Sequence, residues 1–164
     1  MSEFKYEDLE NINDIKLDKQ IAYYIECDSE NYHTAKMLGM GLYDGNKCYY
    51  VAPEMIKDVI DYTREVPTYT FDLKKNIVLL KDIDTNTVYD MNIAAYLLNK
   101  TVKDDIAVLM NNDGLNCPMY HDIIKDQMSL RHIVTLKAKY IYDLHDKYID
   151  DLQAEGMYDL FDTS

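Results

Sequence analysis

Residues 21–51, IAYYIECDSENYHTAKMLGMGLYDGNKCYYV, carry the feature that most limits the possible folds, because side-chain character there changes with a period of two. This period is typical of β-strands, in which successive side chains point to opposite faces of a sheet. The pattern predicts three strands in succession, at Ile21–Glu26, Met37–Leu42 and Lys47–Val51. Tyr43-Asp44-Gly45-Asn46 has the composition of a hairpin turn, in which Gly45 can adopt a positive φ.

Helices and strands alternate after these three strands. The first predicted elements are a helix from Pro53 to about Arg64, a strand at Val66–Phe71 and a helix at Leu73–Asp82 that is capped by Asp72. A strand at Thr87–Tyr89 and a helix at Met91–Lys100, capped by Asp90, follow. The last two are a helix that begins at Thr101, has Asp104 as its acidic partner and ends at residues 111–114, and a long amphipathic helix from Ser129 to about Leu152. One more short strand is predicted at Glu3–Tyr6, and residues 115–127 are predicted to be irregular with one helical turn. The βββαβα order predicts a ribonuclease-H-like α/β fold, a mixed sheet flanked by helices.

Composition limits the classes of function. A chain of 164 residues suffices for one domain with a substantial core, which we place at residues 20–164 after a lead-in segment at residues 1–19. The formal net charge of −13 disfavours a stand-alone nucleic-acid-binding protein, because such proteins gain much of their affinity from neutralised phosphates. Three widely spaced cysteines, with no signal peptide and no long apolar run, predict a cytoplasmic protein with no membrane contact.

Few residues outside the first strands suggest chemistry. Cys117 and His121 have a C-x3-H spacing that can bind a metal, but no second pair accompanies them, so a structural zinc site is not expected. The other histidines, His33, His132 and His145, have no neighbouring nucleophile pattern and are interpreted as structural or surface residues. Gly39 and Gly41 lie inside a predicted strand, which is typical of close backbone packing.

Several segments, in the same order, resemble the 3′–5′ exonuclease (proofreading) domain of bacterial DNA polymerase I. The most specific is VYDMNIAAYLLN, which is similar to the DTMLAAYLLN-like helix of that family. IECDSENYHTAKMLGMGL is similar to the first hairpin of the Bacillus-type domain, and KYIDDL near the C-terminus also fits. The resemblance covers roughly residue 20 to the end of the chain, and it implies a domain that is one part of a larger polymerase.

The metal-binding positions of this family are substituted in this chain. Active members use a D-x-E pair on the first strand, an Asp on the helix after the fourth strand and a Y-x-x-x-D on the last long helix, whose carboxylates hold two divalent metals. Carried over position by position, these ligands fall on Tyr24, Glu26, Lys74, Ile133 and Lys137. Only Glu26 is retained, so the resemblance implies a degenerate site that binds no metal and no other cofactor.

The two lysines at these positions suggest what replaces the metal. Lys137 lies on the apolar stripe of the long helix, where a charge must be solvated, paired or lost, and Lys74 lies close to Ile77 and Val78 on its own helix. We therefore expect one or both lysines to pair with Glu26. The alternative is that both ammonium groups extend to solvent and only their stems are packed.

Three functions remain in view. The first is an inactive exonuclease-like domain with a structural role, whose partner is the polymerase domain of the parent chain and which meets DNA only through that parent. Its surface toward the missing part would be apolar, with Tyr158, Leu160 and Phe161 as candidates. The second is a working exonuclease on single-stranded DNA ends that uses other acids: Asp28, Glu30, Asp72 and Asp90. The third is a DNA- or protein-binding module, which would need an aromatic and basic groove.

Overall fold

Strand β2 lies near the middle of a mixed six-stranded sheet whose order is β1-β4-β3-β2-β5-β6. The computed structural model describes residues 4–29, 31–81, 84–100, 105–115, 117–119 and 127–162. The strands are β1 (Glu7–Asp8), β2 (Ile21–Cys27), β3 (Met37–Tyr43), β4 (Cys48–Val51), β5 (Thr68–Thr70) and β6 (Thr87–Asp90). Strands β2, β3 and β4 pair antiparallel, whereas β2, β5 and β6 run parallel and β1 runs parallel to β4. The predicted ribonuclease-H-like mixed sheet is thereby confirmed.

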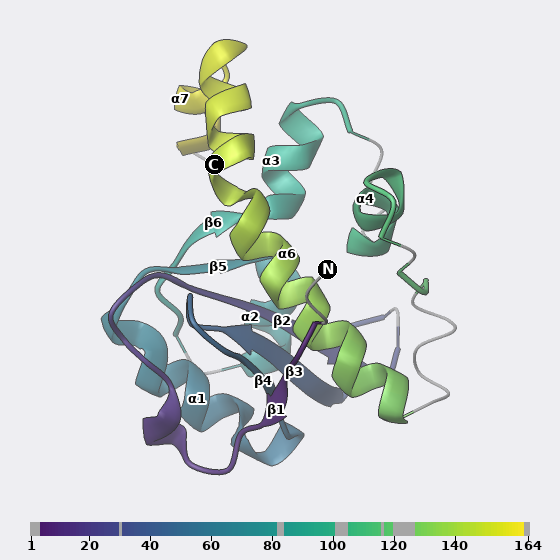
Figure 1. Ribbon diagram of the computed structural model, residues 1–164. Coiled ribbons are helices and arrows are strands. Elements are labelled where there is room, and N and C mark those ends of the chain that lie inside the picture. The colour runs from purple at the N-terminus through teal and green to yellow at the C-terminus, as the bar shows by residue number, and fades with distance from the viewer. Residues whose placement is uncertain are drawn as a thin grey trace.

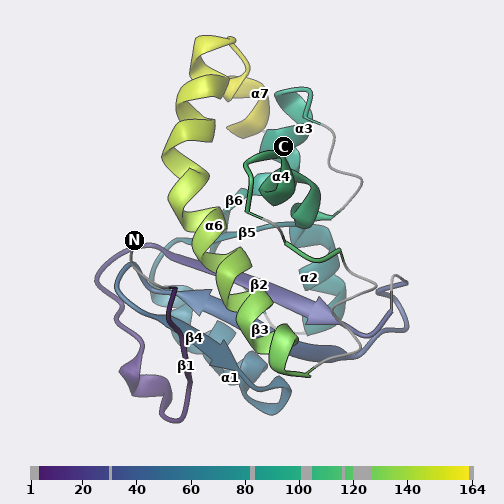
Figure 2. The same cartoon turned by 45° about the vertical axis from the view of Figure 1, so that its right-hand side comes forward.

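Helices cover both faces of this sheet (Figure 1). They are α1 (Ile56–Tyr62), α2 (Leu73–Leu80), α3 (Met91–Leu97), α4 (Ile106–Asn112), α6 (Gln127–Ala154) and α7 (Tyr158–Asp162), with short 3-10 turns at Ile12–Asp14, Pro53–Met55 and Thr63–Glu65. Helix α6 crosses one face, and α3 and α4 pack on the same side, as Figure 2 shows. Helices α1 and α2 close a second apolar cluster on the other face. Among the described residues, no helix has both the length and the apolarity needed to span a membrane.

The β3–β4 turn binds the lead-in segment to the sheet. Gly45 has a φ of +89°, as predicted for this hairpin. The buried carboxylate of Asp44 accepts hydrogen bonds from the backbone N–H groups of Asn46 and Lys47 within the turn. It also accepts one from the N–H of Lys16, at 2.9 Å, so the turn holds the chain that leads into β2.

Gly41 on β3 allows α6 to lie unusually close to the sheet. A Cβ atom at this position would overlap the backbone carbonyl group of Val134 on α6. The expected close packing at the strand glycines is confirmed here, between two backbones, while at Gly39 the space is filled by the ring of Tyr50.

Some predicted boundaries differ from the structure. The helix expected from Pro53 to Arg64 is α-helical only in its middle, between two 3-10 turns. The strand expected at 3–6 is found at Glu7–Asp8, where pairing with β4 sets its limits; residue 3 is outside the described residues. Residues 101–104 are also outside them, and α4 is capped instead by Asp105, whose carboxylate accepts from the N–H of Ala107. Most of residues 115–127 cannot be compared for the same reason, and α6 extends the predicted helix at both ends.

Candidate functional site

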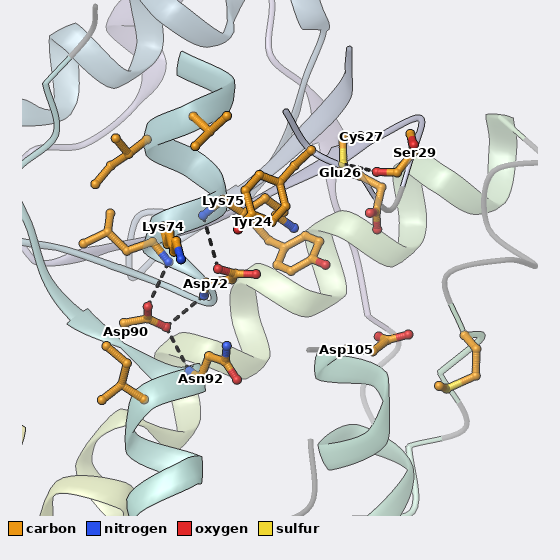
Figure 3. Close-up of a pocket in the computed structure, with 16 residues that line it drawn as sticks. Tyr24, Glu26, Cys27, Ser29, Asp72, Lys74, Lys75, Asp90, Asn92 and Asp105 are labelled. Carbon is orange, nitrogen blue, oxygen red and sulfur yellow. Dashed lines mark hydrogen bonds between the residues drawn. The ribbon is translucent and has the colours of Figure 1, made fainter. Parts of the chain in front are cut away.

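A cavity of about 1000 Å³ opens beside the carboxyl ends of the three parallel strands β2, β5 and β6. Ligand sites in open α/β sheets lie at such edges. Its wall includes Tyr24, Glu26 and Cys27 from β2 and the first residues of α2, α3 and α4 (Figure 3). The fold therefore brings the end of the first strand together with the residues that follow two later strands.

Glu26 and Lys137 form a buried ion pair between β2 and α6. The Nζ atom of Lys137 donates to Oε2 of Glu26 at 3.2 Å, and both side chains are at most 2% exposed. A charged side chain without a partner at this depth would be strongly unfavourable, so the two side chains depend on each other for burial. The expectation that at least one of the two lysines pairs with Glu26 is confirmed for Lys137.

Tyr24 lies between this ion pair and helix α2. Its ring centroid is 4.6 Å from the Nζ of Lys137 and 4.6 Å from the Nζ of Lys75, both within the range of a cation–π interaction. Burial raises the pKa of the Tyr24 hydroxyl well above its ordinary value, and the nearby Glu26 carboxylate raises it further. Tyr24 is thus a neutral side chain, which packs in the core cluster on the α6 face.

Lys74, the other lysine considered as a partner of Glu26, has a different environment. Lys74 is exposed at the edge of the cavity, and no ion pair joins it to Glu26. The next residue, Lys75, is buried and reaches the Tyr24 ring. One position along a helix turns a side chain by about 100°, so Lys74 and Lys75 lie on different faces of α2. Ile133 is buried in the core, one turn of α6 before Lys137.

The carboxylates of the aspartates near the cavity accept hydrogen bonds from backbone N–H groups. Asp90 caps α3 by accepting from the N–H of Asn92, and it also accepts from the N–H groups of Asp72 and Leu73, each at 2.8 Å. Burial raises the pKa of Asp90, although these N–H groups act in the opposite direction. Asp72 caps α2 by accepting from the N–H of Lys75. The predicted caps are therefore confirmed, and Asp105, which the sequence reasoning missed, adds a third one at the cavity wall.

Of the other two acids weighed for catalysis, the structure describes Asp28 alone, and Asp28 is not among the residues that line the cavity. Asp28 is exposed and accepts from the N–H of Lys36, which closes the loop between β2 and β3. Glu30 lies outside the described residues.

The residues at the aligned positions do not fit a divalent cation. Glu26 is the one carboxylate among them, and its Oε2 is already paired with an ammonium. Oxygen-rich sites for Mg²⁺ or Mn²⁺ need several carboxylate or carbonyl ligands around the ion. Across the part of the chain that the structure describes, no three His, Cys, Asp or Glu side chains are grouped so that they could hold a metal.

His33, His132 and Cys117 are not among the residues that line the cavity. His33 is exposed beside Tyr32, and His132 contacts the rings of Phe4 and Tyr6. Cys117 is buried, and burial raises the pKa of its thiol; the C-x3-H pair itself cannot be compared, because His121 is outside the described residues.

His145 belongs to an aromatic cluster at the other end of α6. It stacks on Tyr69 with ring centroids 4.0 Å apart, and its edge meets Tyr89. Phe161 packs against the same Tyr89 ring, with 5.7 Å between the ring centroids, and is half-buried. Tyr158 is also half-buried, and the side chain of Leu160 is outside the description. Tyr158 and Phe161 are thus packed on one side and partly exposed on the other, and their role in an apolar surface toward the polymerase stays a prediction.

Comparison with known proteins places this fold in a family. The family model described as "DNA polymerase I, ribonuclease H-like domain" matches residues 23–128. The chain belongs to this family. It is an exonuclease-like domain of the DNA polymerase I type. A curated relative, DNA polymerase I of Streptococcus pneumoniae serotype 4, is 27% identical over 112 residues, which make up 65% of this chain and 13% of that polymerase. The chain thus spans a small part of the length of the relative it matches.

Solved structures show the same fold at low sequence identity. NrnC of Brucella melitensis has a TM-score of 0.68 and 14% identity, with 97% of this chain and 86% of that chain covered. The catalytic core of RRP6 from Trypanosoma brucei has a TM-score of 0.73 and 11% identity, covering 97% of this chain and 50% of that one. RNase D of Escherichia coli, an exoribonuclease, has a TM-score of 0.65 and 10% identity, covering 93% and 46%.

Proposed function

We propose that this chain is a catalytically inactive exonuclease-like domain with a structural role beside the polymerase domain of its parent protein, in DNA replication and repair. The observation that carries the proposal is the ion pair between Lys137 and Glu26, because it occupies the one carboxylate that the alignment retains at the metal-binding positions. In this proposal the domain contacts the polymerase domain of the same parent chain, and only the parent protein binds DNA. The domain is in the cytoplasm and uses no cofactor.

Charge explains why the site would not take metal. Metal-dependent phosphodiester hydrolysis uses bound cations to activate water and to stabilise the leaving oxygen. A structure of NrnC has been solved with bound Mg²⁺. In this chain a cation at Glu26 would lie beside the Lys137 ammonium, and two like charges repel strongly where little water screens them. Tyr24 would offer it only a neutral phenol.

A nuclease assay tests the loss of activity. We expect the pure chain to leave 5′-labelled single-stranded DNA at full length with Mg²⁺, with Mn²⁺ and with a chelator, because no group of three His, Cys, Asp or Glu side chains among the described residues is placed to hold a metal ion. An active proofreading exonuclease serves as the positive control. Two variants, Asp72→Asn and Asp90→Asn, test the runner-up function, a working exonuclease that uses these acids of the cavity wall. Metal-dependent shortening that either variant abolishes would establish that function and end the proposal.

The structural role calls for a separate measurement on the parent polymerase. Deleting the region that corresponds to residues 20–164 should lower the thermal midpoint of the remaining polymerase by several degrees, because an apolar contact surface then becomes exposed. Nucleotide incorporation at low temperature should persist. An unchanged midpoint would show that the two parts are thermodynamically independent, which contradicts a supporting role.

A further inference from the structure

Lys75 is a buried cation in the cavity wall without an anionic partner. The residue is 9% exposed, and its ammonium lies over the Tyr24 ring. Among the described residues, no carboxylate lies within ion-pair distance of its Nζ atom, and no acceptor is hydrogen-bonded to it. A cation–π contact offsets only a part of the solvation that a buried ammonium loses. An anion in the cavity would supply the missing interaction.

The acids that line the same wall are already engaged. The Glu26 carboxylate is paired with Lys137, and the Asp90 carboxylate accepts from three backbone N–H groups. Asp72 and Asp105 each accept from the N–H group of a helix that they cap. Among the described residues of the wall, the ammonium groups are those of Lys75, inside the cavity, and Lys74, at its exposed edge.

The rest of the described wall is mainly apolar, with Ser29 and Asn92 as polar members. Ile77 and Met119 line the cavity and are among the most exposed large hydrophobic residues of the described chain, at 53% and 39%. Val78 and Ile93 extend the same surface. Cavities of this size that combine an apolar wall with a few polar groups are typical of small-molecule sites.

The charge distribution decides which anion fits. Four carboxylates of described residues line the wall, so a doubly charged group such as a phosphate monoester would meet more repulsion than a singly charged one. The net charge of −13 opposes a polyanion that extends over the surface, such as DNA. At physiological ionic strength, the repulsion from charges on the rest of the surface is screened over about 8 Å. The binding of a compact ligand at Lys75 therefore depends mainly on the charges near it, among them the Lys75 ammonium.

We infer that this cavity binds a small monocarboxylate with an apolar body. The carboxylate accepts a hydrogen bond from Lys75, and the body packs against apolar side chains that line the same cavity. This binding site goes beyond the proposed structural role and does not depend on whether the chain has nuclease activity.

Titration of the isotopically labelled chain with 3-phenylpropionate, followed by backbone amide NMR, tests the site. We expect saturable shifts of residues in α2 and at the end of β2, and a dissociation constant at least tenfold higher for Lys75→Met. The matched control is Lys57→Met, which removes an exposed lysine on α1, on the other face of the sheet, and should leave the dissociation constant unchanged. Circular dichroism establishes that each variant is folded.

Three further ligands identify what the cavity recognises. 3-Phenylpropanamide has the same body without the charge, and acetate has the charge without the body, so both should bind at least tenfold more weakly. Thymidine monophosphate reports any retained nucleotide binding and should also be weaker. Equal binding of the amide, tighter binding of the nucleotide, no response to 3-phenylpropionate or an unchanged constant for Lys75→Met would each overturn the inference, whatever the nuclease assay shows.

Discussion

Replacing Lys137 with methionine is expected to lower the free energy of unfolding by about 3–5 kcal/mol, the range for breaking a buried ion pair on one side. Methionine keeps most of the apolar stem but removes the charge. Glu26 then stays buried, at 1% exposure, without its ammonium partner. It must either carry an uncompensated charge or take up a proton, and both outcomes destabilise the folded state at neutral pH. Urea denaturation followed by circular dichroism measures the loss.

Two matched variants show whether the loss comes from the buried pair. Glu26→Leu combined with Lys137→Met removes both charges and should recover most of the stability, because an apolar pair of similar volume replaces the ionic one. Lys147→Met, also on α6, breaks an exposed ion pair between Lys147 and Asp151, which is one turn further along. It should lower the free energy of unfolding by less than about 1 kcal/mol. If Lys137→Met costs no more than Lys147→Met, the pair is open to water and its assigned role is wrong.

Gly41→Ala is the second change expected to have a large effect. The added methyl group would occupy the position of the Val134 carbonyl, so β3 and α6 would have to separate. Overpacking of a core costs about 1–3 kcal/mol. We expect a value near the upper end, since two backbones rather than a side chain must move. A lower thermal midpoint, together with shifted amide signals along α6, would show the displacement directly.

Gly39→Ala on the same strand is the control for Gly41→Ala. Its new Cβ atom would meet the ring of Tyr50, 2.6 Å away, which can move at the expense of the hydrogen bond from its hydroxyl to the Leu38 carbonyl. Losing one such bond costs about 1 kcal/mol. Losses of the same size for both glycines would contradict the close approach of α6 to the sheet.

The sequence predicted best what depends on local patterns. The alternation in residues 21–51 and the Gly45 turn predicted the central strands, and the spacing of apolar residues predicted the long helix. Lys137 was identifiable because a charge on an apolar helix face requires a partner. Lys75 was missed because it neighbours Lys74 in an eight-residue helix, and only the placement of α2 against β2 decides which of the two is buried. The cap at Asp105 was missed for a similar reason, since Thr101 has an equally suitable side chain nearby.

The crossing of α6 over the central strands has a consequence for the order in which the domain can form during synthesis. Glu26 and Lys137 are 111 residues apart in the chain. A ribosome adds about 5–20 residues per second, so the α6 face of β2 and β3 stays without its cover for several seconds. During that time the strands expose apolar side chains and one acidic group without its cation. The last long helix therefore acts as the closing step of cotranslational folding, and a pause in translation before residue 127 would prolong the interval in which this sheet is vulnerable to aggregation.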